Sequence, residues 1–166
     1  MRIREETATD VEAIAHVTNC AFRDHPHSNQ TEQFIIQALR RAGALTLSLV
    51  AELDSRIVGH AAFSPVVMSD GTPHWYGVGP VSVLPEYQKK GIGSALMTEG
   101  LSRLKDLGAQ GCVLVGDPLY YVRFGFRIHP ALVIDGVPPE VFLALPFTDR
   151  VPHGQATFHR AFQATA

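Results

Sequence analysis

Residues 81–96 read Val81-Ser82-Val83-Leu84-Pro85-Glu86-Tyr87-Gln88-Lys89-Lys90-Gly91-Ile92-Gly93-Ser94-Ala95-Leu96, an apolar run that passes through a short loop into a helix. The first N–H groups of a helix have no partner inside it, and they lie at the positive end of the helix dipole. Gly91 and Gly93 leave room for an oxyanion to approach these groups, because glycine carries no Cβ. The stretch therefore predicts a binding site for phosphate or pyrophosphate.

Two common phosphate-binding motifs do not fit this loop. A mononucleotide P-loop requires Gly-x-x-x-x-Gly-Lys-Ser/Thr, which the stretch does not contain. A dinucleotide fingerprint requires Gly-x-Gly-x-x-Gly, but Leu96 occupies the position of the third glycine. An unrelated nucleotide-binding enzyme that shares only a strand-loop-helix anion site stays open as an alternative.

The loop resembles the pyrophosphate loop of the GNAT superfamily of acetyl-CoA-dependent N-acetyltransferases. The resemblance covers the preceding strand, Pro85, Gln88, Gly91, Gly93 and the apolar helix that follows, with Gln88 at the usual position of an arginine. A second block, Tyr121-Val122-Arg123-Phe124-Gly125-Phe126, resembles the Tyr-x-x-x-Gly-Phe of that superfamily about 30 residues downstream of the loop. Two blocks in this order are far more specific than one glycine loop.

The resemblance implies a fold and an activity. The implied fold class is α/β (α+β): a GNAT-like mixed, mostly antiparallel sheet with a central β-loop-α-β acyl-CoA-binding unit and flanking helices. The implied reaction moves an acetyl group from acetyl-CoA, as cosubstrate, to an amine of a small-molecule or peptide acceptor. It proceeds by direct transfer in a ternary complex, and no metal is expected. A non-catalytic acyl-CoA-binding module is the alternative.

Glycine and proline within the strand before the loop predict a cleft. Gly77, Gly79 and Pro80 interrupt strand-like sequence, and such residues mark either a bulge or an edge strand. A bulge would separate this strand from the buried strand at Gly111–Val115 and, by resemblance, admit the pantetheine arm. The residues implied to bind the cofactor are Val81, Ser82, Val83, Gln88, Lys89, Lys90, Gly91, Ile92, Gly93 and Ser94.

Tyr121 is the candidate catalytic residue, because it stands four residues before Gly125, where the family places its general acid. A phenol can protonate a thiolate within hydrogen-bond reach. Tyr120 lies about 100° away round the same helix, so only one of the two can point at the sulfur. Asp117-Pro118 is typical of a helix N-cap followed by proline at the first helical position. The general base is not identified, since the strand from Trp75 to Leu84 contains no acidic residue.

Length predicts one domain over residues 1–166, because a chain of 166 residues is the size of a single domain, and the resemblance implies that this domain is an N-acetyltransferase (GNAT-like) domain. With 46% hydrophobic residues, 18% charged residues and a net charge of −2, the chain is typical of a globular protein. No basic stripe or amphipathic basic helix indicates nucleic acid or membrane as a partner. Cys20 and Cys112 are expected to be reduced thiols in a cytoplasmic protein. A homodimer is compatible with the sequence.

Periodicity and turn residues predict the elements. Helices are expected at Val11–Cys20 after a Thr9-Asp10 cap, through Phe34–Leu39 to near Gly43, at Gly91–Leu107 and at Pro118–Phe124. Strands are expected at Met1–Glu6, Leu47–Leu53, Ile57–Val67, Trp75–Leu84, Gly111–Val115, Val141–Leu145 and Gln155–His159. The loop Asp24–Gln30, the segment Met68–Trp75 and the C-terminal turns are expected to set acceptor specificity, with Phe22, Phe34 and Trp75 as apolar candidates for the acceptor pocket. His25 and His27 form only a weak metal-ligand pattern, because no cysteine or carboxylate stands at metal spacing.

Overall fold

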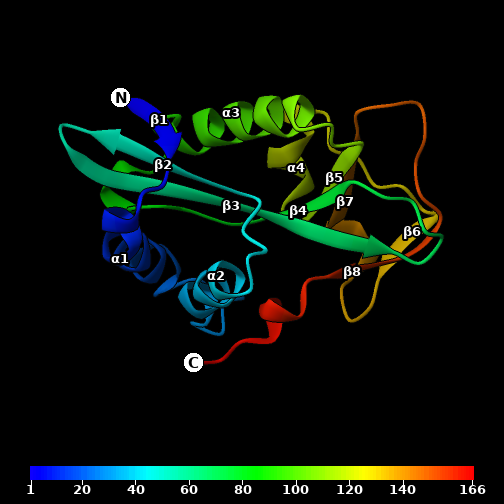
Figure 1. Ribbon diagram of the computed structural model, residues 1–166, viewed down its shortest axis with the longest axis horizontal. Helices are drawn as coiled ribbons and strands as arrows, with labels where there is room; N and C mark the ends of the chain where they lie inside the picture. Colours follow the sequence, from blue (N-terminus) through cyan, green and yellow to red (C-terminus); the bar gives the residue numbers. More distant parts are fainter.

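The computed structural model describes residues 1–166, which form an eight-stranded sheet with helices on both faces (Figure 1). Six strands follow the order β1-β2-β3-β4-β5-β7, and β8 pairs with both β3 and β6 beyond that path. All pairs are antiparallel except β4 with β5 and β6 with β8. The strands are β1 Arg2–Glu5, β2 Leu47–Leu53, β3 Arg56–Met68, β4 Trp75–Val83, β5 Gly111–Val115, β6 Leu132–Ile134, β7 Phe142–Pro146 and β8 Gly154–Phe158. The mixed, mostly antiparallel sheet confirms the expected fold class.

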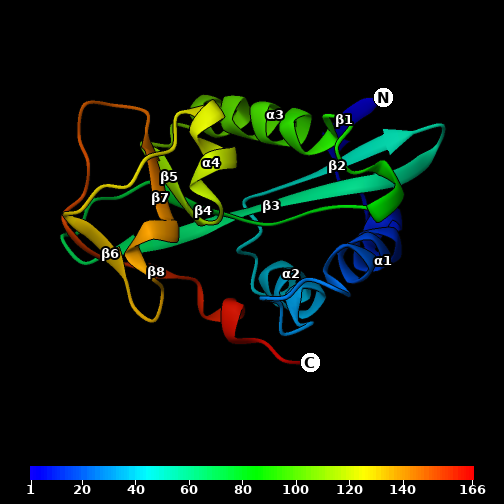
Figure 2. The same cartoon turned by 180° about the vertical axis from the view of Figure 1, so that it is seen from behind.

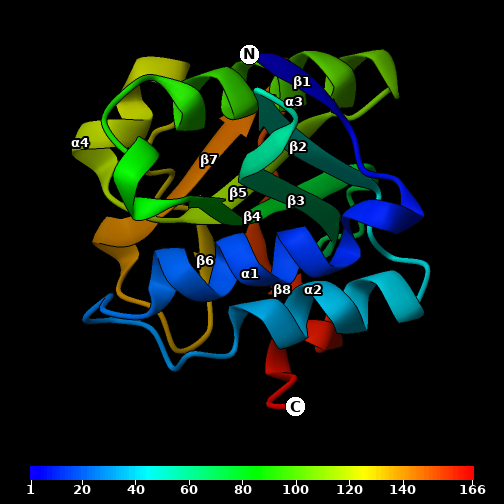
Figure 3. The same ribbon diagram turned by 90° about the vertical axis from the view of Figure 1, so that its left-hand side faces the viewer.

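Four α-helices and five short 3-10 turns accompany the sheet. The helices are α1 Val11–Phe22, α2 Glu32–Arg41, α3 Ile92–Asp106 and α4 Pro118–Tyr121. Figures 1 and 2 show α3 and α4 on one side of the strands and α1 and α2 on the other. Figure 3 shows α1 and α2 lying side by side beneath the strands. None of these helices is both long and apolar enough to span a lipid bilayer.

Local sequence explains the hairpin of β2 and β3. Asp54 and Ser55 connect the two strands with positive φ values of 50° and 64°, as a two-residue turn of the primed type requires. The alternating apolar residues of both strands then meet the helices on the two faces. The predicted hairpin is confirmed, with Leu53 paired to Arg56 beside the turn.

Glycines bring α3 close to the sheet. A Cβ on Gly59 of β3 would lie 3.1 Å from side-chain atoms of both Ile92 and Leu96. A Cβ on Gly100 of α3 would overlap the ring of Phe63, which is fully buried in β3. Backbone therefore touches side chain at both points, and this contact holds the first turns of α3 over the centre of the sheet.

The predicted bulge in β4 is confirmed, and the edge-strand alternative is wrong because β4 lies between β3 and β5. The register of β3 and β4 shifts between the pairs Ala61–Val81 and Phe63–Val78, so Gly79 and Pro80 together stand opposite the single residue Ala62. The pairing of β4 with β5 covers only Trp75–Gly77. Beyond Gly77 the two strands separate, and the expected cleft opens between them.

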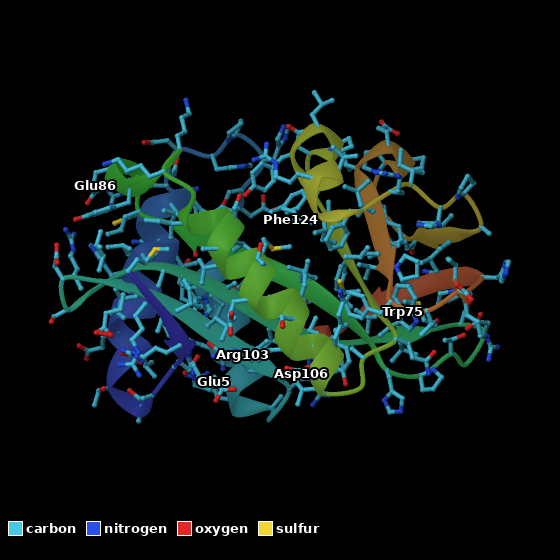
Figure 4. All side chains as sticks on the ribbon, turned by 90° about the horizontal axis from the view of Figure 1, so that it is seen from above. Glu5, Trp75, Glu86, Arg103, Asp106 and Phe124 are labelled. Carbon is cyan, nitrogen blue, oxygen red and sulfur yellow. The ribbon has the colours of Figure 1, made fainter.

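Charged side chains connect the N-terminal strand to its neighbours. Figure 4 shows Arg103 of α3 beside Glu5 of β1, and their charged groups are 3.8 Å apart. Arg4 of β1 binds Asp10 at 2.7 Å and Glu52 of β2 at 3.0 Å. The predicted cap of α1 differs in detail, because the Asp10 carboxylate accepts from Thr7 N–H at 2.7 Å instead of from an N–H group of α1.

Candidate active site

The cleft between β4 and β5 contains a cavity of about 890 Å³, within the usual range for small-molecule sites. One wall is the bulged part of β4 from Val78 to Val83, and the opposite wall is the end of β5 and the start of α4. The C-terminus of α1 lines one end through Phe22. The separation of two parallel strands thus creates a long, mainly apolar site in the middle of the sheet.

Backbone groups of Val81 and Val83 face this cleft. Leu84 N–H donates to the carbonyl of Val58 on β3 at 2.9 Å. In an antiparallel ladder the neighbouring residues turn their N–H and C=O groups to the other side, which here is the side of β5. The Val83 carbonyl accordingly accepts from Gln88 Nε2 at 2.9 Å. Val81 therefore presents main-chain hydrogen-bonding groups to the cavity where β5 has diverged.

A second cavity of about 410 Å³ lies at the N-terminus of α3. Lys89 and Gly91 have positive φ values of 62° and 86°, so the loop turns sharply just before the helix. The N–H groups of the first helical turn have no partner inside α3 and form the positive end of a 15-residue helix. A Cβ on Gly93 would lie 3.5 Å from the Tyr120 hydroxyl oxygen, within the same cavity.

The two cavities adjoin, because Val83, Gln88 and Tyr120 line both. A ligand with an anionic end and a long, mainly apolar arm would fit this path. Residue by residue, most of the predicted cofactor-binding set lines it. The larger cavity is lined by Val81, Ser82, Val83 and Gln88, and the smaller cavity is lined by Val83, Gln88, Lys89, Gly91, Ile92, Gly93 and Ser94.

Lys90 lies apart from the other predicted cofactor-binding residues. Its ammonium group lies 5.5 Å from the ring centroid of Tyr87, and the side chain lines neither cavity. Arg123, in contrast, lines the smaller cavity, with its guanidinium 4.3 Å from the ring centroid of Tyr120. Lys89 and Arg123 are therefore the basic residues that line the cavity at the helix N-terminus.

Tyr121 lines the larger cavity from α4. Its ring packs against Gly116, where a Cβ would come within 2.5 Å of the ring, and edge-on to Phe126. Burial, with the nearby Tyr120 and Asp117, raises the pKa of Tyr121 to about 12. The phenol therefore keeps its proton throughout the physiological range of pH.

The adjacent Tyr120 makes different contacts. Its hydroxyl is 3.2 Å from Ser94 Oγ on α3, in the smaller cavity. The two tyrosine rings meet edge to face with centroids 4.9 Å apart. The 100° step between them on the helix directs one hydroxyl to the N-terminus of α3 and leaves the other in the interior of the cleft.

The predicted role of Asp117 as a helix cap is confirmed. Asp117 Oδ1 accepts from Leu119 N–H at 2.9 Å, and Pro118 occupies the first turn of α4. Gly125 ends the following 3-10 turn with φ of 100°. The tight turn at each end of Pro118–Phe124 thus fixes where Tyr121 lies.

The end of the cleft nearest α1 combines residues that the sequence did not bring together. His25 and His27 from the loop after α1 meet Pro138 and Val141 from the segment before β7. Phe22 lines this end as expected, but Trp75 does not, because its side chain is 1% exposed in the core between β4 and β6. No group of three or more histidine, cysteine or acidic side chains is arranged to hold a metal ion. Only the crossing of distant loops creates this end, so no local motif could have revealed it.

Known proteins are similar to this chain in sequence and in fold. Residues 11–126 match the Acetyltransferase (GNAT) family. The N-acetyltransferase YhbS of Escherichia coli K12 is 35% identical over 129 residues, which are 77% of this chain and 74% of that protein. A GNAT family acetyltransferase of Brucella melitensis, solved in complex with acetyl-CoA, is 48% identical with a TM-score of 0.87 and 97% coverage of both chains. Escherichia coli YhbS, solved in complex with CoA, has a TM-score of 0.86 at 30% identity and covers 99% of this chain and 93% of its own.

This mixed sheet is shared with acetyltransferases solved in complex with acetyl-CoA or CoA, which places the chain in the class of acyl-CoA-dependent acyltransferases. The chain belongs to the GNAT family of acetyl-CoA-dependent N-acetyltransferases. The resemblance inferred from the loop and from the Tyr-x-x-x-Gly-Phe block is thereby confirmed.

Proposed function

We propose that this protein transfers the acetyl group of acetyl-CoA directly to an amine of a small-molecule or peptide acceptor, within a ternary complex. The observation that carries the proposal is that the two cavities adjoin and share Val83, Gln88 and Tyr120 as lining residues. One path joins an anion-binding helix end to a buried cleft. That cleft opens at its far end beside His25 and His27, where an acceptor can enter.

The chain's own groups would hold acetyl-CoA in three places. The N–H groups at Ile92, Gly93 and Ser94, together with the charges of Lys89 and Arg123, bind the pyrophosphate. Main-chain groups of Val81 and Val83 pair with the amides of the pantetheine arm and with the acetyl carbonyl. Gln88 fixes the loop by its bond to the Val83 carbonyl. Ser82 and Lys90 remain in the predicted set, with Lys90 contributing through its charge.

Tyr121 is the proposed general acid. The raised pKa of Tyr121, about 12, keeps the phenol protonated, so that its hydroxyl can give a proton to the departing CoA thiolate. Tyr120 is less suited to this step, because its hydroxyl already contacts Ser94 Oγ. Direct transfer requires both substrates at once, and a cavity of about 890 Å³ leaves space for the acceptor beside the arm.

A thiol-release assay tests the proposal. The full-length protein is given acetyl-CoA and a panel of phenethylamine, spermidine, free amino acids and peptides with free N-termini. We expect amine-dependent release of CoA with at least one member and acetylated amine as the product. Binding of acetyl-CoA without release of CoA would favour the alternative, a non-catalytic acyl-CoA-binding module.

Three wider expectations belong to the same proposal. Residues 1–166 are expected to act as one domain, because all eight strands belong to one hydrogen-bonded sheet. The homodimer stays a prediction that sedimentation velocity tests. A cytoplasmic location stays a prediction, and the free thiols of Cys20 and Cys112 agree with it.

A further inference from the structure

A row of buried polar side chains crosses the sheet away from the proposed catalytic tyrosine. His60 of β3 is completely buried, and its Nε2 lies 2.7 Å from Ser48 Oγ on β2. Ser48 in turn donates to the carboxylate of Glu6. Arg40 of α2 binds the same carboxylate through two bonds of 2.9 and 3.0 Å. None of these side chains has a place in the acetyl transfer described above.

The charge of Glu6 decides which atoms of this row carry protons. Burial alone raises the pKa of Glu6, but bonds from Arg40 and Ser48 outweigh it and lower the pKa, so the group is a carboxylate. A carboxylate can only accept hydrogen bonds, and therefore the Ser48 hydroxyl donates its proton to the hydrogen bond with Glu6. The Ser48 oxygen must then accept from His60, which places the ring proton on Nε2. The Nδ1 atom is left as a bare, basic nitrogen.

This bare Nδ1 is buried and has no hydrogen-bond partner in the protein. An unsatisfied buried acceptor costs about 1–3 kcal/mol, so its presence calls for a reason. Burial lowers the pKa of His60 to about 4, Glu6 opposes that shift and Arg40 adds to it. These two are the charged groups whose fields reach the ring, while Ser48, Ser82 and Thr18 are uncharged. His60 is thus neutral near pH 7, and a proton that it accepts is passed on because the imidazolium form is unfavourable.

The two ends of the row lie at cavities on opposite sides of β3. Ser82 Oγ lies 3.4 Å from Thr18 Oγ1, its side-chain hydrogen-bond partner. Ser82 of β4 is the direct partner of His60 in the antiparallel register and lines the acetyl-transfer cavity. Directly opposed residues have Cβ atoms about 5 Å apart on the same face of the sheet, and one water can bridge such a gap. At the other end, Glu6, Ser48 and Arg40 line a separate cavity of about 350 Å³ between β1 and α2.

We propose that Ser82, His60, Ser48 and Glu6 form an exit path that carries the proton released by the acceptor amine from the active site to the cavity beside Arg40. The inference rests on the proposed acetyl transfer. An ammonium acceptor that becomes an amide loses two protons, of which one goes to the thiolate and one must leave. This second proton passes through Ser82 to Nδ1 of His60, while the Nε2 proton passes to Ser48 and the Ser48 hydroxyl proton passes to Glu6, which releases it. A rotation of the imidazole ring that returns its proton to Nε2 then restores the starting tautomer for the next turnover.

The path supplies a proton acceptor, which β4 lacks. No acidic side chain stands on β4, and the only carboxylate that lines the cleft, Asp117, is engaged in capping α4. His60 touches neither substrate, so it is a positioning residue for the proton and not a catalytic residue. His60 raises kcat at neutral pH, where the acceptor amine arrives as an ammonium ion.

The tautomer of His60 is the first test, and it needs no acceptor. Nitrogen-15 NMR of the labelled full-length protein distinguishes the two ring nitrogens, and the His60→Gln spectrum identifies the His60 signals. We expect the Nε2–H tautomer, with a bare Nδ1, from pH 6 to pH 9. A proton on Nδ1, or an imidazolium at pH 7, would overturn the path.

The second test compares rates of thiol release across pH, with the panel amine that gives the fastest release. His60→Gln keeps an N–H for Ser48 but removes the basic nitrogen. We expect its kcat to fall about 10-fold to 100-fold at pH 7, with unchanged KM for acetyl-CoA. The loss should shrink to less than about threefold at pH 9.5, because more of the amine is then already neutral. A packing defect would lower kcat equally at both pH values.

Ser48→Thr and Ser48→Val form a matched pair that separates proton transfer from packing. The two side chains have nearly the same shape, and only threonine has a hydroxyl. We expect Ser48→Val to be at least about tenfold slower than Ser48→Thr at pH 7. Equal rates in this pair, or a wild-type rate in His60→Gln, would overturn the path while leaving acetyl transfer standing. Wild-type protein that releases no thiol with any amine would overturn both.

Discussion

At the scale of single residues, neighbouring side chains of one type have different roles because the helix turns between them. Tyr120 and Tyr121 are adjacent in α4, but the Tyr120 hydroxyl contacts Ser94 and the Tyr121 ring lies on Gly116 inside the cleft. Burial keeps the Tyr121 phenol neutral, with a pKa of about 12. A proton donor for a thiolate must hold its proton until the transition state, and Tyr121 meets this condition.

Tyr121→Phe should lower kcat by about 100-fold, or about 3 kcal/mol, and leave the affinity for acetyl-CoA unchanged. Phenylalanine keeps the ring and its packing, so a loss of stability should not imitate a loss of catalysis. Steady-state thiol release gives kcat, and isothermal titration gives the affinity. Because the pKa of Tyr121 is raised, kcat of the wild type should show no alkaline decline from this residue below pH 11.

Tyr120→Phe is the matched control in the same helix. We expect at most a threefold change of kcat, roughly, because only the bond to Ser94 Oγ is lost. A full loss in Tyr120→Phe with normal kcat in Tyr121→Phe would show that the general acid is the other tyrosine. Normal kcat in both would mean that solvent protonates the thiolate.

The Asp10 carboxylate supplies a prediction for stability. It is 6% exposed, and two nitrogens of Arg4 bind it at 2.7 and 3.1 Å. The Arg4 bonds are the main cause that lowers the pKa of Asp10 to about 2, from an ordinary value of 3.8. A depressed carboxyl pKa stabilises the fold above the unfolded pKa, and this contribution disappears as pH falls through the folded pKa.

Asp10→Asn should therefore reduce the free energy of unfolding by about 2 kcal/mol at pH 7, and by progressively less between pH 4 and pH 2. Urea denaturation at several pH values measures this difference. Asp106→Asn is the control, because Asp106 is exposed near the end of α3. Equal losses for both variants at pH 7 would contradict the role of the Arg4 pair.

At the scale of elements, α3 combines packing and binding in one helix. Its N-terminus opens on the smaller cavity, and Gly100 in its middle accepts the ring of Phe63. Contact through glycine brings the helix backbone nearer to the sheet than side chains would allow. The same close approach holds the N–H groups of the first turn beside β4, where the two cavities meet.

Gly93→Val should weaken acetyl-CoA binding at least tenfold, or by more than about 1.4 kcal/mol, with little change in fold. The nearest atoms to a Cβ at Gly93 are 3.5 and 3.9 Å away, which are ordinary contacts, so the protein can accommodate the start of the side chain. The added methyl groups would instead occupy the space proposed for pyrophosphate. Isothermal titration measures the affinity, and circular dichroism checks the fold.

Thr98→Val introduces the same side chain on the exposed face of α3. We expect normal affinity for acetyl-CoA in this variant, since residue 98 lines neither cavity. Unchanged affinity in a folded Gly93→Val protein would contradict the placement of the pyrophosphate at this helix end.

At the scale of the whole molecule, the cleft divides the sheet into two parts that share few strand pairings. Pairing of β4 with β5 is limited to Trp75–Gly77, and β5 continues into β7 on one side while β4 pairs with β3 on the other. A ligand in the cleft would contact both parts at once. Binding should therefore raise the stability of the entire fold.

Acetyl-CoA at 100 times its Kd should add about 2.7 kcal/mol to the free energy of unfolding, which raises Tm by several degrees. Differential scanning calorimetry with acetyl-CoA, CoA, ATP and NAD measures the shift for each ligand. We expect the two CoA ligands to stabilise the protein strongly at concentrations where NAD has no effect. Equal shifts with NAD and acetyl-CoA would contradict a cleft adapted to the pantetheine arm.

Local signals in the sequence predicted most elements to within one or two residues. The Leu47–Leu53 strand, the Asp54-Ser55 turn and the Gly111–Val115 strand depend on nearby residues alone, and all are confirmed. The strand β6 was missed, because three residues at Leu132–Ile134 carry no periodicity and pair only with β8, which lies more than twenty residues further on. The distant partner supplies the hydrogen bonds that make this segment a strand.

The sequence by itself determined the glycine loop before α3, the caps of α4 and the position of Tyr121, since glycine, proline and aspartate act on the backbone within a few residues. Only the tertiary structure decided which groups meet. The row from Ser82 through His60 and Ser48 to Glu6 joins four segments of the chain, and it depends on the register of β2, β3 and β4. A histidine between Gly59 and Ala61 is visible in the sequence, but its burial and its hydrogen-bond partners are not, because a shift of one residue in either strand pairing would place other side chains beside it.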